Sequence, residues 1–124
     1  MKRPIVSVLS VFSFLSAAAS ALAQNAPPTY QGDPAVYKVI FEDANFRVIS
    51  IDRKKGVTDK PHSHPVPGII YNVSDCSTKL HDANGQTRDQ ISKAGTASAT
   101  PIISSHTAEN IGSADCHQII VEKK

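Results

Sequence analysis

The sequence lacks tryptophan altogether, and its 124 residues include only four phenylalanines, three tyrosines and one methionine. Aromatic side chains bury more area than any others, so a chain with few of them loses a large contribution to its core. We therefore expect a core built mainly from Ile, Val and Leu. A stability that is ordinary or marginal for a small domain follows from that composition.

Acidic residues are missing from the first 23 positions. Lys2 and Arg3 precede an apolar stretch over residues 5–22, and Ala21, Leu22 and Ala23 end it with small side chains. This pattern is typical of a secretory signal peptide, so we predict that residues 1–23 are removed and that the protein is periplasmic or secreted. The alternative is a retained anchor, because the stretch is nearly long enough to span a bilayer. The Ala- and Ser-rich end favours cleavage, after which we expect no stable membrane insertion.

A net charge of either sign is also absent from the predicted mature chain. Of the thirteen Lys and Arg residues, the signal peptide removes Lys2 and Arg3, and the eleven that are left equal the eleven Asp and Glu residues. Without a dense basic patch, the sequence argues against a nucleic-acid partner. The one basic run, residues 53–55, lies between Asp52 and Asp59, and we interpret it as a solvated turn instead of a phosphate site.

Only two cysteines are present, Cys76 and Cys116. An exported protein meets an oxidising compartment, in which two thiols form a disulfide where the geometry permits. A disulfide that closes the loop between Cys76 and Cys116 would stabilise the fold by roughly 4 kcal/mol in the chain-entropy model. The alternatives are two separately buried free thiols, or one reactive thiol near a functional site.

The predicted mature chain shows strand signals and no sustained helical period. Residues 24–35 are rich in Pro, Asn and Gly and are predicted to be an extended N-terminal segment, followed by one domain over residues 36–124. Asn84-Gly85 predicts a hairpin turn of type I′, which needs positive φ at both central residues. An all-β fold is the economical interpretation. The expected strands, rich in Val, Ile, Thr and aromatic residues, cover residues 36–41, 46–51, 68–73, 77–81, 102–109 and 116–121.

Three histidines form the strongest functional signal. Side chains alternate across a strand, so His62 and His64 would project to the same side and could bind one ion together. A third imidazole, His106, would arrive from a distant strand. Such a set could hold a metal and leave coordination positions open for water or substrate.

The spacing around these histidines resembles the two motifs of the cupin family. Gly56, His62 and His64 match the first motif, although Ile69 stands at its Glu and Cys76 at its closing Gly. In the second motif Ile103 replaces the central Gly. The positions that match the second motif are Gly95, Pro101, His106 and Asn110.

The resemblance implies a double-stranded β-helix, or jelly-roll barrel, with His62, His64 and His106 as metal ligands inside it. The usual carboxylate ligand is missing at Ile69. Three neutral imidazoles suit one divalent transition metal, Fe, Zn, Ni or Cu, better than Mg or Ca. Because imidazoles bind metals in their deprotonated form, occupancy is expected to fall below about pH 6. Some cupins have lost their metal, but buried imidazoles need partners, and this favours binding here.

The family resemblance further implies a small-molecule ligand in the barrel. Apolar walls are expected from Ile69, Ile70, Val73, Ile102 and Ile103, and Tyr71 could place its hydroxyl near the metal or could be a core ring. Two functions follow: a dioxygenase-like oxidoreductase, or a periplasmic module that binds a small ligand or metal without turnover. The sequence does not decide between them. Exposed edge strands favour a homodimer.

Overall fold

The computed structural model describes residues 25–124, so the predicted signal peptide, residues 1–23, lies outside the described residues. The described part of the chain contains nine strands and one turn of helix, and none of its helices is long and apolar enough to cross a bilayer. The elements are α1 (Thr29–Gly32), β1 (Tyr37–Glu42), β2 (Phe46–Arg53), β3 (His62–His64), β4 (Gly68–Asn72), β5 (Cys76–Asp82), β6 (Thr87–Ser92), β7 (Ala97–Thr100), β8 (Ile103–Asn110) and β9 (Cys116–Lys123).

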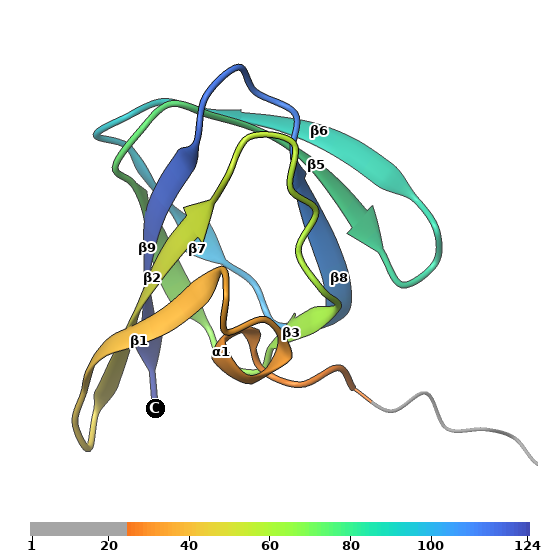
Figure 1. The fold of residues 1–124 in the computed structure, drawn as a ribbon. Helices are drawn as coiled ribbons and strands as arrows, with labels where there is room; N and C mark the ends of the chain where they lie inside the picture. Colours follow the sequence, from red (N-terminus) through yellow and green to blue (C-terminus); the bar gives the residue numbers. More distant parts are fainter. Residues whose placement is uncertain (1–24) are drawn as a thin grey trace, which may run out of the picture.

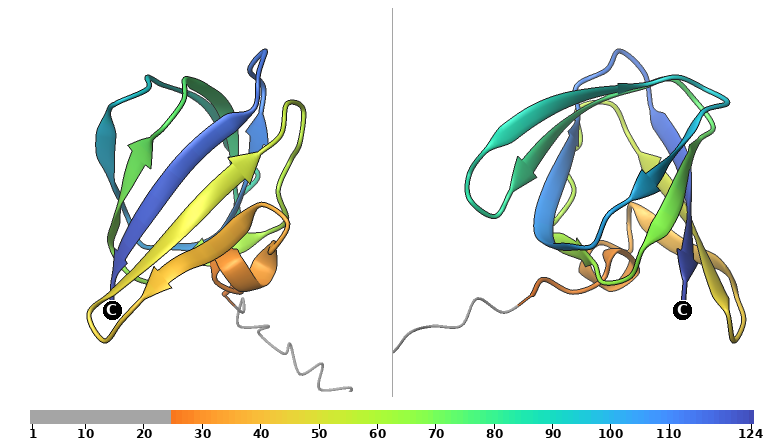
Figure 2. Two further views of the ribbon diagram at one scale, coloured as in Figure 1. Left: turned by 60° about the vertical axis from the view of Figure 1, so that its left-hand side comes forward. Right: turned by 180° about the vertical axis from the view of Figure 1, so that it is seen from behind.

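The strands form two sheets that face each other (Figures 1 and 2). One has five strands in the order β1-β2-β9-β4-β7, and the other has four in the order β3-β8-β5-β6. Strands distant in sequence are neighbours, as where β9 lies between β2 and β4, and this gives the double-stranded β-helix. The all-β prediction is confirmed, but over residues 25–124 the two sheets do not join into a closed barrel.

Three strands lie outside the predicted ranges: β3, which the alternation of its histidines implied, and β6 and β7, which nothing indicated. Both β6 and β7 are edge strands of their sheets. The sequence of β6 is Thr-Arg-Asp-Gln-Ile-Ser and that of β7 is Ala-Ser-Ala-Thr, so neither alternates large apolar with polar residues. An edge strand needs less apolar burial than a central strand, and the pattern that identifies a strand in a sequence is therefore weak there.

The turn between β5 and β6 differs from the predicted type I′. Gly85 has a φ of 79°, but no non-glycine residue among residues 25–124 has a positive φ, so Asn84 does not. The Gly85 amide donates to the Asp82 carbonyl, and one Asp82 carboxylate oxygen accepts from the amides of Asn84 and Gln86. These bonds make a longer loop, in which a type I turn ends in a left-handed glycine.

The N-terminal segment, predicted to be extended, contains the helical turn α1 and packs against β3. The Ser63 amide donates to the Pro27 carbonyl, and the backbone of residue 28 pairs with that of Ser63. Gly32 lies so close to β3 that an added Cβ would be 3.2 Å from the Cβ of His62 and 3.0 Å from the Pro61 carbonyl oxygen. A glycine at this position therefore lets α1 support the strand that carries two of the histidines.

The apolar core lies between the sheets and is small. It consists of Val36, Tyr37, Ile49, Ile51 and Ile120, with Tyr30 and Ile70 packed against it. Isoleucine is the commonest residue in this cluster, as expected for a chain without tryptophan. Several polar side chains are buried beside the core, so hydrogen bonds and ion pairs stabilise a large part of the interior.

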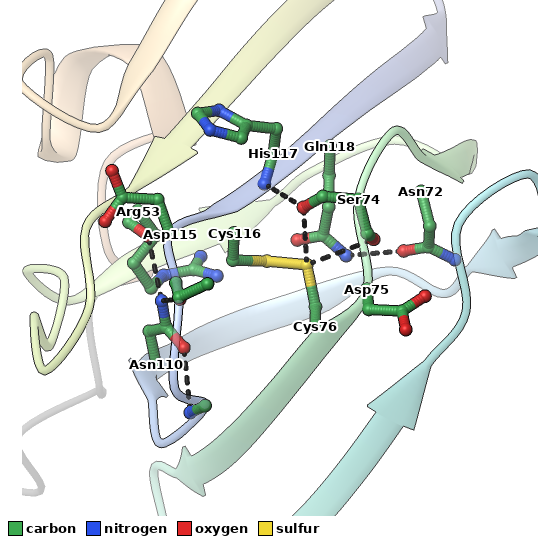
Figure 3. Close-up of a disulfide and its surroundings, with 12 residues drawn as sticks. Arg53, Asn72, Ser74, Asp75, Cys76, Asn110, Asp115, Cys116, His117 and Gln118 are labelled. Atoms are coloured by element: carbon green, nitrogen blue, oxygen red, sulfur yellow. Dashed lines mark hydrogen bonds between the residues drawn. A yellow bond between two sulfur atoms is a disulfide. The ribbon is translucent and has the colours of Figure 1, made fainter.

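A disulfide joins Cys76, at the start of β5, to Cys116, at the start of β9 (Figure 3). The prediction of this bond is confirmed. The two Cα atoms are 5.2 Å apart, and 40 residues separate the cysteines in sequence. Because β5 and β9 belong to different sheets, the bond links the two layers at one end of the fold.

We expect that replacing both cysteines by serine lowers the free energy of unfolding by about 2–5 kcal/mol, since the unfolded chain gains the freedom of the open loop. Urea unfolding of the wild type and of the Cys76→Ser/Cys116→Ser variant measures this difference. Ser77→Ala, next to the bond on β5, is a control that should change it little. Equal unfolding midpoints for the double variant and the wild type would contradict this expectation.

Candidate metal centre

The three histidines predicted as metal ligands lie together on the inner face of the four-stranded sheet. His62 and His64 are on β3, and His106 lies opposite His62 on the neighbouring strand β8. Each ring offers a nitrogen within 4.8 Å of the other two. The Nε2 atoms of His64 and His106 are 3.0 Å apart. The alternation predicted for His62 and His64, together with the pairing of His62 and His106 across the strands, therefore brings the three side chains to one point.

The surroundings of His62 fix which of its nitrogens is free to bind. Its Nδ1 lies 2.9 Å from the Lys60 carbonyl oxygen, which only accepts hydrogen bonds, so Nδ1 carries the proton of the neutral ring. Nε2 then has a lone pair. The nearest polar neighbour of Nε2 is the Tyr37 hydroxyl at 3.2 Å, but the proton of that hydroxyl is donated to Asp59 at 2.6 Å. His62 thus presents an unprotonated nitrogen that lacks a donor.

A buried network of Tyr37, Arg53 and Asp59 supports His62. The Arg53 guanidinium donates to the Tyr37 hydroxyl at 2.7 Å and to Asp59 at 2.8 Å. The other Asp59 oxygen accepts from the Ala108 amide at 2.6 Å. Each of the three side chains is at most 3% exposed. Charge-assisted bonds of this kind hold the hydroxyl, and the imidazole beside it, in one orientation.

All three imidazoles are neutral near pH 7. Burial lowers the pKa of His62, and burial together with the neighbouring His62 ring lowers the pKa of His64 to about 4. Burial followed by the charges of His62 and His64 lowers the pKa of His106 to about 3. Each ring nitrogen without a proton is therefore available as a ligand over a wider pH range than that of an exposed histidine.

These pKa values predict a loss of stability in mild acid for the metal-free protein. The unfolded chain binds protons at the ordinary histidine pKa of about 6.5, whereas folded His64 and His106 bind them only near 4 and 3. The unfolded state therefore holds more protons between these values, and the free energy of unfolding falls as the pH falls through that window.

Urea unfolding at about pH 7 and about pH 5 measures this loss, because ordinary carboxylates stay largely ionised over that interval. The variant His106→Gln should lose less stability between the two pH values than the wild type does. The exposed residue His81 offers a control, and His81→Gln should keep the wild-type loss. An identical loss in His106→Gln and in the wild type would contradict this account of the buried imidazoles.

The donor set fits a transition metal. Nitrogen ligands about 2.0–2.1 Å from a tetrahedral or octahedral ion lie roughly 2.9–3.4 Å from each other, and the 3.0 Å separation of the His64 and His106 nitrogens is within that range. The rings meet edge to face, with centroids 4.5 to 5.4 Å apart, so their nitrogen edges converge instead of stacking. Imidazole nitrogens suit Zn, Cu, Fe and Ni.

A cavity of about 110 Å³ lies beside the histidines, between the two sheets. Its walls are partly apolar, with Ile51, Ile70, Ile103 and Ile120, and partly polar, with Tyr37 and Arg53. A second cavity of about 310 Å³ lies toward the β5–β6 hairpin and shares His106, Leu80 and Arg88 with the first. The predicted wall residues Ile70 and Ile103 therefore line the cavity.

The other predicted pocket residues face the opposite way. Ile69 is 55% exposed and Tyr71 is 45% exposed, because on β4 it is Gly68, Ile70 and Asn72 that point inward. Val73 and Ile102 are exposed as well. The prediction for Ile69 and Tyr71 was wrong by one residue of strand register, which moves a side chain to the other face of the sheet.

The register of β4 also bears on the carboxylate ligand that the cupin motif usually supplies. No Asp or Glu lines the first cavity among the described residues, and the inward residue next to the predicted Glu position is Ile70. The three imidazoles are therefore the candidate ligands that the cavity offers. A divalent ion held by them would keep its full double charge and would polarise a bound ligand strongly.

A second group of metal-type ligands, Asp52, Asp115 and His117, lies on the surface. The Lys54 ammonium already sits between the two carboxylates, 3.3 Å from Asp52 and 3.0 Å from Asp115. His117 lies 3.5 Å from Asp52. This cluster is a partly exposed ion-pair network on the surface.

Tyr37, Arg53 and Asp59 were missed as site residues, and Arg53 was wrongly assigned to a solvated turn. The signal for Arg53 is present in the sequence, because it continues the inward alternation of Ile49 and Ile51 on β2. Asp59 and Tyr37 carry no local signal, since they meet His62 only through the packing of a loop and of β1 against β3. Long-range contacts of this kind are not visible in local sequence patterns.

No protein-family model matches this sequence, and no curated protein is similar to it in sequence. Solved structures resemble it closely in fold. A cupin domain protein from Bordetella pertussis Tohama I aligns over 72% of this chain and 92% of its own, with 15% identity and a TM-score of 0.66. A cupin family protein with a double-stranded β-helix from Methanocaldococcus jannaschii aligns over 71% and 78%, with 14% identity and a TM-score of 0.57.

An enzyme is also among the similar structures. The polyketide cyclase RemF from Streptomyces resistomycificus aligns over 70% of this chain and 63% of its own, with 17% identity and a TM-score of 0.53. At such identities these similarities concern the fold and leave the chemistry to be argued from the site.

Proposed function

We propose that this domain, which has the cupin fold, binds one divalent transition metal (Fe, Zn, Ni or Cu) through His62, His64 and His106 and acts on a small molecule as a dioxygenase-like oxidoreductase. The observation that carries the proposal is the convergence of three neutral imidazoles, two of them buried and that of His106 half-buried, beside a cavity. Buried polar groups need partners, and a metal ion would satisfy all three lone pairs at once.

The surrounding residues supply what such a centre requires. When bound, the metal provides a Lewis-acidic centre with open coordination positions, and Fe or Cu adds redox chemistry. The Lys60 carbonyl holds the proton of His62 on Nδ1, and the Tyr37 ring packs beside the imidazole with centroids 4.9 Å apart. Ile51, Ile70 and Ile120 present apolar surface that limits the access of water.

Hydrolytic chemistry has little support. No carboxylate lines the first cavity among the described residues, so a general base of the usual kind is lacking. Burial raises the pKa of the Tyr37 hydroxyl well above its ordinary value, so this group stays protonated, donates its proton to Asp59 and does not act as a base. A reaction with O₂ depends more on open coordination positions at the metal and on apolar cavity walls that exclude water than on an ionised side chain.

The second candidate is a binding module that holds a small ligand or a metal without turnover. The same lack of a positioned acid or base in the cavity supports it, because capture requires only complementary walls and ligands. Untagged protein should carry about one metal ion per chain by elemental analysis. O₂ uptake by the iron form with a panel of thiols and phenols then decides between the candidates: consumption supports the enzyme, and an inert form supports the module.

We also propose that residues 1–23 are a signal peptide, that residues 24–35 lead into the cupin domain of residues 36–124, and that the mature protein is periplasmic or secreted. The Cys76–Cys116 disulfide supports this, because such bonds persist outside the reducing cytoplasm. The N-terminal residue of the exported protein, determined by mass spectrometry, tests it. A mature chain that still begins at Met1 would contradict the signal peptide.

A homodimer is the final part of the proposal. The outer face of the five-stranded sheet carries one row of apolar side chains with a member on every strand. The strand register places each member beside the one on the neighbouring strand. A symmetric pairing with a second copy would bury this row against itself. The row consists of Phe41, Val48, Val121, Ile69 and Ala99.

We expect the wild type to sediment as a dimer and Ile69→Lys as a monomer, because a charge in the middle of the apolar row opposes its burial. Analytical ultracentrifugation measures both states. Ile91→Lys, which alters a still more exposed isoleucine on β6 in the other sheet, is the control and should stay dimeric. A monomeric wild type at all concentrations would refute the dimer.

A further inference from the structure

Arg88 is an exposed residue of β6 that lines the space beside the metal centre. It pairs with Leu80 on β5, which in turn pairs with Ala108 on β8, so the three side chains form one row across the sheet. Ala108 is buried, which identifies this row as facing inward. His106 lies two residues before Ala108 on the same face. Arg88 accordingly lines both cavities together with His106.

No carboxylate among the described residues pairs with Arg88. Its chain neighbour Asp89 points to the other face and binds Lys79 at 2.7 Å. The remaining arginine of the first cavity, Arg53, is different, because Asp59 neutralises it at 2.8 Å. Arg88 is therefore the uncompensated cation of the cavity walls.

The charge balance of the first cavity is positive, whereas in the second one carboxylate stands against the Arg88 charge. The imidazoles are neutral, and the first cavity has no Asp or Glu among the described residues. The second has one, Asp82, and an oxygen of that carboxylate already accepts two backbone amides of the hairpin turn.

We propose that Arg88 anchors the carboxylate of a small organic acid whose apolar body lies between the sheets. A guanidinium and a carboxylate match in a planar, two-bond geometry, which makes arginine selective for this group. Leu80, Pro101 and Ile103 line both cavities and offer the apolar walls for the body of the ligand. A cavity of about 110 Å³ admits only a small molecule.

This inference names the ligand class of the proposed function and rests on it. A carboxylate at Arg88 would direct the rest of the molecule along the wall that leads to His106. The anchor and the metal centre would then select the ligand at two separate points. Arg88 contacts none of the three histidines through a hydrogen bond, so its role can be tested apart from the metal.

The test uses metal-free protein and two probes of equal shape, benzoate and its neutral analogue benzamide. Calorimetric titration near pH 7 should give benzoate an affinity at least about tenfold higher, because a hydrogen bond between two charged groups contributes more to binding than one to a neutral amide. The variant Arg88→Gln should lose this preference. Lys38→Gln, which removes an equal charge from β1 in the other sheet, should keep it.

Equal affinity for the two probes, the absence of binding by either probe, or a preference that survives in Arg88→Gln would overturn the proposal. Because no metal is present, these results are independent of the metal site. Metal analysis of Arg88→Gln completes the design. A wild-type metal content in this variant, together with the lost preference, supports an anchor that acts on the ligand alone, and a lost metal would place Arg88 in the metal site and overturn it.

Discussion

Replacing His106 with alanine is expected to lower the affinity for Zn²⁺ or Fe²⁺ by more than about 100-fold. Residues that only orient a metal ligand already contribute 10–100-fold to affinity, and His106 is proposed to be a ligand itself. The separation of 3.0 Å between its Nε2 and that of His64 also means that its loss leaves His64 without its nearest partner. Competition titration with a chromophoric chelator measures the dissociation constants.

The matched control for this experiment is His81→Ala. His81 lies near the end of β5, where it faces Glu109 at 3.5 Å and is partly exposed. It should bind metal as the wild type does. A His106→Ala variant that folds, shown by a cooperative unfolding transition, and that keeps wild-type affinity would remove His106 from the ligand set.

The variant Asp59→Ala is expected to lower the free energy of unfolding by about 3–5 kcal/mol. It leaves the Arg53 charge buried without its partner and takes an acceptor from the Tyr37 hydroxyl and from the Ala108 amide. An unpaired buried charge is among the most destabilising changes in a protein interior. Urea unfolding measures the change, and metal affinity should fall with it because the freed Tyr37 hydroxyl can donate to His62 Nε2, 3.2 Å away, and compete with the metal.

Two further variants separate the lost ion pair from a general effect of truncation. Asp89→Ala removes an exposed carboxylate paired with Lys79 and should leave the unfolding midpoint nearly unchanged. The double variant Arg53→Met/Asp59→Ala removes both charges and should recover part of the lost stability. An Asp59→Ala protein as stable as the wild type would contradict the role assigned to the network.

The parts of the fold that local sequence patterns determine could be predicted. Central strands such as β2 and β9 are rich in Ile and Val, and the motif glycines Gly56 and Gly95 adopt positive φ values of 76° and 80°. The edge strands β6 and β7 lack that composition because they bury little. The helical turn α1 was also missed, because it packs against β3 and no local sequence pattern indicates it.

The histidines of the candidate site could be predicted from the sequence, but the residues that surround and support them could not. Alternation along β3 was enough to place His62 and His64 on one side. The positions of Ile69 and Tyr71 depended on the register of β4, which the counting of motif residues missed by one. Asp59, Tyr37 and Arg88 converge on the site from a loop and two other strands, so only the folded chain brings them together.

The most direct test of the metal centre is a crystal structure of the untagged protein, grown with the metal identified by elemental analysis and measured at its absorption edge. The account predicts one anomalous peak about 2.0–2.2 Å from a ring nitrogen of each of His62, His64 and His106. An anomalous map without a peak at this point, in protein that carries stoichiometric metal, would contradict it.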